Sequence, residues 1–322
     1  MFDAWQEFRK DKKNKPDIIK FSLNLENNIF ELYDKLVNKT WEADKYASFL
    51  IKDPKLRHIH KASVRDRVLY HSVYRILYPI FDKTFIFDVY SSRKSKGTHA
   101  GVKRLTTLSR KLSKNYTQTI YVLQCDIKKF FDSMDHEILL ELLSEQITDG
   151  DTISLVKKII DSFHKTQGKG LPLGNVTSQL FANVYMNPFD WFVKKEIGAR
   201  NYIRYCDDFL ILSTSRDYLF GLIPKIEKFL ENNLHLHLHP EKISVSSLKQ
   251  GIDFLGYVAM PHYSVLRTKT KHRIFRRLKI LALENDPELF ERAKASYLGI
   301  ISYCNGLLIK RTINNIIKNI FN

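Results

Sequence analysis

The sequence predicts an α+β protein in which strands and helices do not alternate regularly. Two runs rich in β-forming residues, "TIYVLQCDI" and "YIRYCDDFLILS", lie far apart in the chain. Other segments, such as "HEILLELLSEQI" and "LFGLIPKIEKFLENN", place apolar residues at helical spacing. This order favours one sheet whose strands come from distant parts of the chain, with helices on one face.

The composition indicates a globular protein with a polyanionic partner. Of the 322 residues, 27% are charged and 44% hydrophobic. Lysine and arginine total 52 against 35 acidic residues, which gives a formal net charge of +17. This excess predicts binding to nucleic acid or to an anionic membrane surface, and the lack of a long apolar run favours nucleic acid. The charged N-terminus and three scattered cysteines predict a cytoplasmic protein with reduced thiols.

The first part of the chain is predicted to be mostly helical. Apolar residues in "LENNIFELYDKLVNKTW" have helical spacing, and a helical pattern returns over residues 64–81. Between them, "YASFLIKDPKLRHIHKAS" predicts two short strands around a turn at Asp53-Pro54. Residues 91–114 carry eight basic residues and no acidic one.

The middle of the chain begins with a predicted strand that ends on Asp126. The helix at "HEILLELLSEQI" has Ser133 or Asp135 as its candidate cap. The glycine-rich loop "GKGLPLGN" precedes a helix in "VTSQLFANVYMN". Pro188 is a candidate first residue of the next helix, with Asn187 as its cap.

The last part of the chain begins with two predicted strands around a tight turn, over residues 202–213. A helix follows, then the extended segment "LHLHLHPEKISVSS" and a strand pair in "GIDFLGYVAM". The tail from about residue 268 is predicted to be helical. Residues 266–279 contain seven basic residues and no acidic one.

Two conspicuous patterns are predicted to be structural. His235, His237 and His239 alternate, but no acidic residue or cysteine is spaced to complete a metal site. We therefore expect histidines that face solvent. Cys125 and Cys206 each precede an aspartate and are expected to be small buried residues.

The aspartates carry the chemical signal of this sequence. Asp207 and Asp208 lie within an apolar run, where they could cap a β-turn or form part of a site. A second strand ends on Asp126, and if it pairs beside the turn, the carboxylates converge and repel unless cations neutralise them. Magnesium prefers oxygen ligands, and two such ions can assist an in-line phosphoryl displacement.

Several boxes, in order along the chain, resemble those of reverse transcriptases. "YCDD" resembles their YxDD box, "CDIKKFFDSMDH" their first palm aspartate motif and "GLPLGNVTSQLFANVYMN" their template–primer helix. "KLRHIHKASVRDRVLYHSVYRILYPIF" is similar to their fingers, "FLGY" to the primer grip and "SYLGIISYCN" to the thumb of bacterial, group II intron-like enzymes. The resemblance implies a right-hand polymerase fold. Its parts would be N-terminal helices and fingers at 1–115, a palm at 116–260 with a finger insertion at about 140–172, and a thumb at 261–322.

The resemblance implies an RNA-directed DNA polymerase that uses two Mg²⁺ ions, with Mn²⁺ able to substitute. The implied metal ligands are Asp126, Asp207, Asp208 and Ile127. Phe131 occupies the position of the steric gate that excludes a ribose 2′-hydroxyl. The alternative is that Phe131 is an ordinary core residue.

The resemblance also implies contacts to nucleotide and template from Leu173, Gly174, Ser178 and Gln179. Lys242 matches a lysine near the incoming triphosphate, although it could be a solvated turn lysine. Arg57 and Lys61 are candidate triphosphate contacts from the fingers. Arg65 and Arg67 could serve instead.

The helix motif distinguishes among subfamilies. An aliphatic Leu173 before Gly174, with Ser178-Gln179 at the end, resembles the error-prone enzymes of diversity-generating retroelements. We do not expect an intron maturase, since the chain leaves no room after the thumb for a further domain. An antiviral-defence reverse transcriptase and a non-catalytic RNA-binding scaffold remain alternatives. The implied partners are a template RNA, the RNA/cDNA duplex, deoxynucleoside triphosphates and a small basic accessory protein.

Overall fold

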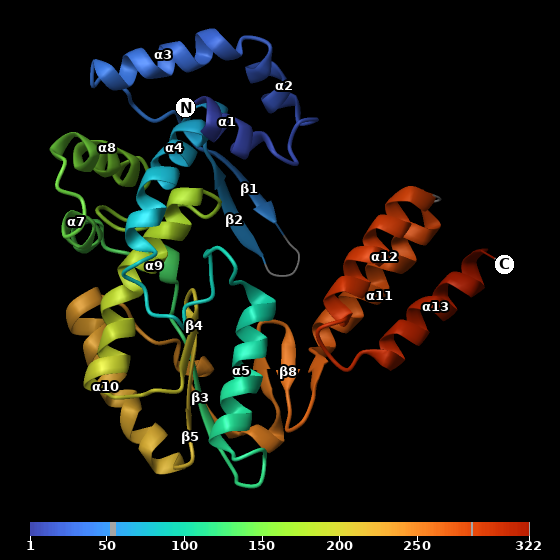
Figure 1. Cartoon of the computed structure of the whole chain (residues 1–322). Coiled ribbons are helices and arrows are strands. Elements are labelled where there is room, and N and C mark those ends of the chain that lie inside the picture. The colour runs from blue at the N-terminus through green and yellow to red at the C-terminus, as the bar shows by residue number, and fades with distance from the viewer. Residues whose placement is uncertain (52–55, 285, 322) are drawn as a thin grey trace. The chain divides into compact units, whose positions relative to one another are not determined.

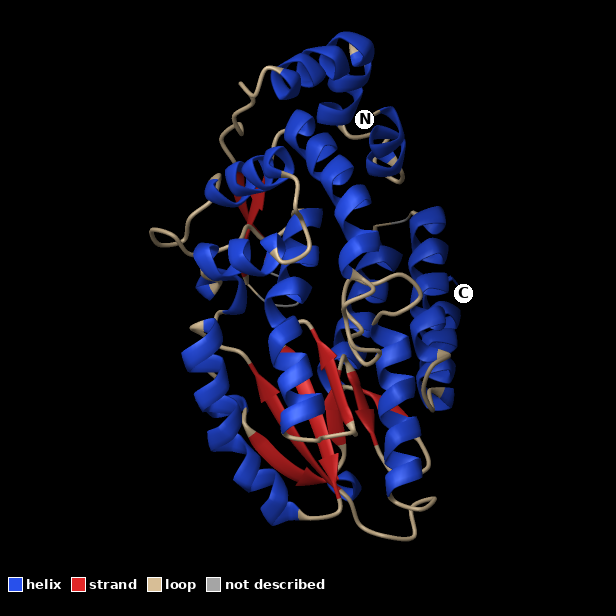
Figure 2. Ribbon diagram, turned by 60° about the vertical axis from the view of Figure 1, so that its left-hand side comes forward, coloured by secondary structure: helices blue, strands red, loops and turns tan. Residues whose placement is uncertain are grey.

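The computed structural model describes residues 1–51, 56–284 and 286–321. Helices are mixed with antiparallel strands, as predicted for the α+β class (Figure 2). The chain divides into two compact units, each built from separate segments. The first unit contains residues 1–87, 127–198 and 225–239, and the second contains residues 88–126, 199–224 and 240–322.

The first unit begins with the predicted helices. They are α1 (Phe2–Arg9), α2 (Pro16–Ser22), α3 (Leu25–Val37) and α4 (Val64–Phe81). Trp5 and Phe8 of α1, Ile18 of α2 and Ile29 of α3 pack with Val68 of α4 in one cluster. Burial of these apolar faces holds the four helices together.

A β-hairpin in the first unit confirms the predicted strand pair. β1 (Ala47–Ile51) and β2 (Arg57–Lys61) pair antiparallel. The predicted turn at Asp53-Pro54 lies outside the described residues.

The remaining helices that lie wholly in the first unit are α6 (Phe130–Ser133), α7 (His136–Ser144), α8 (Gly150–Asp161) and α9 (Val176–Trp191). Of these, α7 and α9 match helices predicted from the sequence, whereas α6 and α8 were not predicted. Asp135 is the cap of α7, since its carboxylate accepts a hydrogen bond from the Glu137 N–H at 3.1 Å. Ser133 instead ends α6.

The prediction that Pro188 begins a new helix is wrong. Pro188 lies inside α9, which continues to Trp191 and into a π-helix at Phe192–Glu196. Tyr185 and Phe189 on either side of it are fully buried. Burying them in one continuous helix outweighs the backbone hydrogen bond that proline cannot donate.

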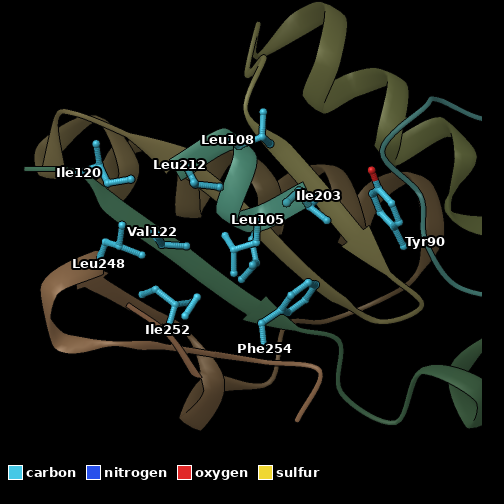
Figure 3. Close-up of a cluster of buried hydrophobic side chains, with 12 residues drawn as sticks. Tyr90, Leu105, Leu108, Ile120, Val122, Ile203, Leu212, Leu248, Ile252 and Phe254 are labelled. Atoms are coloured by element: carbon cyan, nitrogen blue, oxygen red, sulfur yellow. The ribbon is translucent and has the colours of Figure 1, made fainter. Parts of the chain in front are cut away.

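The second unit contains a four-stranded antiparallel sheet in the order β4-β5-β3-β6. Its strands are β3 (Tyr121–Asp126), β4 (Tyr202–Tyr205), β5 (Asp208–Ser213) and β6 (Ser244–Ser247). Helix α5 (Thr98–Leu112) contributes to the core of this sheet. Figure 3 shows its Leu105 and Leu108 beside Val122, Ile203 and Leu212 of the strands. Distant segments thus form one sheet, as predicted.

A smaller sheet and a helical tail complete the second unit (Figure 1). The strands are β7 (Ile252–Phe254), β8 (Tyr257–Ala259) and β9 (Ser264–Leu266). The helices are α11 (Thr268–Leu283), α12 (Pro287–Ile301) and α13 (Leu307–Phe321). Their apolar side chains share a cluster with Val102 of α5 and Tyr257 of β8.

The predicted extended segment before β6 is only partly correct. It follows α10 (Arg216–Leu234), and its histidine part is irregular apart from a bridge at Leu238. The Leu236 N–H donates to the Leu230 carbonyl at 3.0 Å, and a 3₁₀ helix begins at Pro240. The Leu236 N–H is therefore not available for hydrogen bonding to a neighbouring strand. Leucines 234, 236 and 238 are nevertheless buried. His235 and His237 are exposed as predicted, whereas His239 is half-buried.

The described part of the chain contains no helix that is both long and apolar enough to cross a membrane.

Candidate active site

Three carboxylates predicted to bind metal come together at one end of the four-stranded sheet. β3 and β5 pair with Asp126 directly opposite Asp208. Tyr205 also pairs with Asp208, so Cys206 and Asp207 form the two-residue turn between β4 and β5. Directly opposed residues of antiparallel strands have Cβ atoms about 4.5–5.5 Å apart. The strand register therefore sets the acidic side chains against one another.

The turn that carries Asp207 has an unfavourable backbone conformation. Cys206 has φ 59, which is uncommon for a residue other than glycine. A positive φ at this position is what a tight hairpin turn of type II′ requires. The Cys206 N–H donates to the Ser91 hydroxyl at 2.9 Å, and its carbonyl accepts from Nη1 of Arg204 at 3.0 Å. These two hydrogen bonds hold the turn in place.

Arg204 and its surroundings were not identified from the sequence. Arg204 is fully buried within β4, and its backbone bonds to the carbonyl of Asp88 and the N–H of Tyr90. Asp88 is also buried and accepts two bonds from Arg104, at 2.8 and 3.1 Å. The available signal was an arginine inside the apolar run "YIRY", because charged residues are almost never fully buried unless paired.

Burial and like charges raise the pKa of both aspartates that follow Cys206. For Asp207 burial is the larger cause, followed by the Asp126 carboxylate. The pKa of Asp208 is raised to about 7 by burial, then by Asp126 and Asp207. Ionising all three groups costs free energy unless a cation is near.

Lys242 supplies one positive charge at this cluster. Its Nζ lies 2.6 Å from Oδ1 of Asp126, and its side chain is partly exposed. The structure therefore brings the predicted triphosphate lysine to a predicted metal ligand. One ammonium is too little charge to neutralise three carboxylates.

The donor set suits Mg²⁺ that is completed by substrate. Over the described ranges, no group of three or more His, Cys, Asp or Glu side chains has the arrangement of a complete metal site. Mg²⁺ usually binds through one or two carboxylates, with waters and substrate phosphates as its other ligands. Asp126 and Asp207 can supply those carboxylates. The buried Ile127 side chain is a hydrocarbon without a donor atom, so only the backbone carbonyl of this residue could act as a ligand.

A second set of predicted residues gathers in the first unit, around strand β2. The His60 N–H of β2 donates to the Leu173 carbonyl at 3.4 Å. Gly174 has φ +117, and a side-chain Cβ there would lie 3.5 Å from Cγ2 of Ile59. The positive φ makes glycine the suitable residue at this position.

A cavity of about 480 Å³ adjoins this contact and is lined by Lys61, Gly174 and Gln179, among others. Ser178 is buried in α9 and does not line the cavity. Phe131 is half-buried in α6, and its carbonyl accepts from the Leu171 N–H at 2.8 Å. This bond ties α6 to the loop that precedes α9.

The basic fingers candidates differ in their partners. Lys61 and Arg67 share the Asp17 carboxylate, at 2.7 and 2.6 Å. Arg65 pairs with Asp44 and Asp66. Within the described part of the chain, Arg57 is exposed and pairs with no acid, so it is the most available of the four for an anionic ligand.

Cys125, Cys206 and Cys304, all within the described residues, form no disulfide bond with one another. Cys125 is fully buried within β3. Burial raises the pKa of the Cys206 thiol to about 12, so it stays protonated beside Asp207. These properties agree with structural roles.

Residues 51–259 match the family model described as reverse transcriptase (RNA-dependent DNA polymerase). Protein YkfC of Escherichia coli (strain K12) is 24% identical over 242 residues, which cover 63% of each chain. The group II intron-encoded protein LtrA of Lactococcus lactis subsp. cremoris is 22% identical over 272 residues, covering 63% of this chain and 44% of LtrA. The chain thus spans less than two thirds of either relative.

Two solved structures have a similar fold. One is the apo telomerase of Candida tropicalis truncated from its C-terminal domain, with TM-score 0.54 and 14% identity over 74% of this chain and 59% of that chain. The other is the Candida albicans telomerase in complex with a fragment of telomeric RNA, with TM-score 0.53 and 14% identity over 85% of this chain and 54% of that chain. The predicted right-hand polymerase fold is thereby confirmed.

The raised pKa of Asp208 predicts a stability difference that depends on pH. Without metal, the native carboxyl keeps a proton that the unfolded chain releases between pH 3.8 and about 7, so the wild type loses stability as pH rises through that window. The Asp208→Asn variant cannot ionise there and should be the more stable protein at pH 8, by at most about 4 kcal/mol. Urea unfolding in EDTA at pH 4 and pH 8 measures this difference. The matched control is Asp217→Asn, a change at an exposed aspartate. The prediction would be contradicted if the free energy of unfolding differed between Asp208→Asn and the wild type by the same amount at both pH values.

Proposed function

This chain belongs to the reverse transcriptase family, and from that premise we propose that it is an RNA-directed DNA polymerase that copies a template RNA into cDNA. The observation that carries the proposal is the register that sets Asp126 opposite Asp208, with Asp207 in the adjoining turn. Carboxylates opposed in this way favour a bound cation, and metal-assisted phosphoryl transfer needs one.

In the proposed reaction, a primer 3′-hydroxyl attacks the α-phosphate of a deoxynucleoside triphosphate, and pyrophosphate leaves. Asp126 and Asp207 offer carboxylate oxygens to Mg²⁺ or Mn²⁺, and Ile127 offers its carbonyl. When bound, two such ions supply Lewis-acid stabilisation to the attacking and leaving oxygens. Lys242 adds positive charge beside Asp126, which suits an incoming triphosphate.

We assign recognition of nucleotide and template to the residues around β2 and the start of α9. Gly174 and Gln179 line a cavity there together with Lys61, and Arg57 is exposed on the same strand. A backbone without a side chain at Gly174 allows close approach of a ligand. Buried Ser178 fits a role in packing α9 beneath this surface. These features support Arg57 and Lys61 as triphosphate contacts.

The duplex is assigned to the basic face of α11. Ile274 and Leu278 of this helix are buried, whereas Arg276, Arg277 and Lys279 are exposed. An amphipathic helix with one basic face can contact phosphates without reading sequence.

Within the family, we propose an error-prone enzyme of a diversity-generating retroelement. The support is the motif Leu173-Gly174 with Ser178-Gln179, which resembles the motif of these enzymes. Leu173 is half-buried, and its carbonyl accepts a hydrogen bond from the His60 N–H of β2 next to the cavity-lining Gly174. An apolar side chain has no polar group that a mispaired nucleotide would leave unpaired.

Loss of a predicted metal ligand should abolish DNA synthesis. Asp207→Ala is expected to eliminate primer extension with Mg²⁺ while RNA binding stays near wild type, because binding depends on phosphate contacts elsewhere. Primer extension and RNA filter binding measure the two properties. Asp217→Ala, an exposed aspartate on α10, is the matched control. Extension by Asp207→Ala at the wild-type rate would refute the mechanism.

Removal of the Phe131 ring should admit ribonucleotides. Phe131→Ala opens space at the proposed gate without touching a carboxylate, so incorporation of ribonucleotides should rise relative to deoxynucleotides. Single-nucleotide incorporation with each triphosphate measures the ratio, and Phe30→Ala, an exposed phenylalanine on α3, is the control. An unchanged ratio would mean that Phe131 is only a packing residue.

Leu173→Gln should increase fidelity, most clearly opposite template adenines. A glutamine amide is left badly paired by a misplaced nucleotide, whereas an apolar contact separates close substrates by only about 1–3 kcal/mol, roughly 10–200-fold. Sequencing of cDNA made on one template measures the error spectrum, with Leu23→Gln, 84% exposed, as control. If the wild type and Leu173→Gln are both active and have equal error spectra, Leu173 does not influence fidelity. Accurate copying of adenine by the wild type would favour the antiviral-defence alternative.

A further inference from the structure

A large groove lies in the second unit, along the solvent side of α5. Its volume is about 910 Å³, and its walls are α5, the turn at residues 262–264 and the turn at residues 302–305. The Asn305 N–H donates to the Ser264 carbonyl at 2.7 Å, which joins the two turns. None of the residues predicted for the active site lines this groove.

The groove is strongly basic. Lys103, Arg110 and Lys111 of α5, with Lys114 just past its end, are all exposed and line it. No acidic residue lines it, and among the described residues none of the four pairs with a carboxylate. Arg104 contrasts with them, since its guanidinium binds buried Asp88. The outer face of α5 therefore concentrates positive charge that the fold does not neutralise.

Aromatic rings stand at the same groove. The His99 and Tyr303 rings stack with centroids 3.7 Å apart and an interplanar angle of 16°. Tyr303 is 55% exposed and Tyr263 is 48% exposed. Cations that track phosphates, beside aromatic faces on which bases stack, are the elements of a single-strand binding site.

We propose that this groove binds a single-stranded stretch of RNA that is not the strand being copied. An acidic peptide would satisfy the cations but would gain nothing from the exposed ring faces. A basic accessory protein would be repelled by the four cations. A membrane surface is flat on this scale and would not fill a groove between a helix and two turns. This binding site is additional to the proposed polymerase function. The proposal rests on that function only in naming RNA as the bound polymer.

The test removes the charge and the stacking ring separately. The first variant carries Lys103→Gln, Arg110→Gln, Lys111→Gln and Lys114→Gln, which keeps good helix formers on α5. Its matched control removes the same charge from exposed sites, by Lys13→Gln, Lys20→Gln, Lys225→Gln and Lys228→Gln. The second variant is Tyr303→Ala, with Tyr303→Phe as control because it retains a stacking face.

The probe is a labelled oligouridylate of about 16 nucleotides, added to protein saturated with an unlabelled blunt RNA/DNA duplex. We expect the quadruple variant to bind it at least about tenfold more weakly, with a salt slope smaller by up to about 3. Tyr303→Ala should weaken binding about 5- to 150-fold without changing that slope, and the controls should stay near wild type.

Wild-type oligouridylate binding by both variants would overturn the proposal. So would loss of polyglutamate binding by the quadruple variant with RNA binding intact, which would indicate an acidic protein partner. Primer extension on a short primed template reports on the polymerase function separately. If the wild type extends the primer but the groove variants bind RNA as the wild type does, the groove proposal is refuted and the polymerase function is not.

Discussion

Repulsion among carboxylates at the end of β3 and β5 is the constraint on which the second unit depends. Antiparallel pairing sets Asp126 opposite Asp208, and burial together with the Asp126 and Asp207 carboxylates raises the pKa of Asp208 to about 7. Like charges directly opposed across strands destabilise a sheet. This arrangement is unfavourable without a bound cation, and a divalent cation at the site would offset the repulsion.

The surrounding structure maintains this arrangement with hydrogen bonds to the turn and to strand β4. The left-handed Cys206 is held on one side by the Ser91 hydroxyl and on the other by buried Arg204. The backbone of Arg204 pairs in turn with the segment around Asp88. A strained turn persists only where its surroundings determine it more than once. The geometry of the site therefore depends on the sheet and the segments that pack on it, and not on the turn alone.

Helix α5 connects this core to the outer surface of the second unit. Leu105 and Leu108 pack into the cluster beneath the sheet, and Val102 joins the cluster of the helical tail. The opposite side of the same helix presents Lys103 and Arg110 to the groove. Part of the chain's positive charge is therefore presented by a well-packed helix.

Local patterns in the sequence determined the strands that end on Asp126 and begin at Asp208, the fingers-like hairpin and most helices, because periodic burial and β-forming residues act over a few neighbours. They also identified the aspartates, since carboxylates in apolar strands need a partner. Only the tertiary structure decided that Pro188 lies within a helix, because long-range burial outweighed a lost backbone bond. It alone revealed the support of the turn by Arg204, and the contact of Lys242 with Asp126. Those contacts join segments far apart in the chain, and a local pattern contains no information about which distant groups packing will bring together.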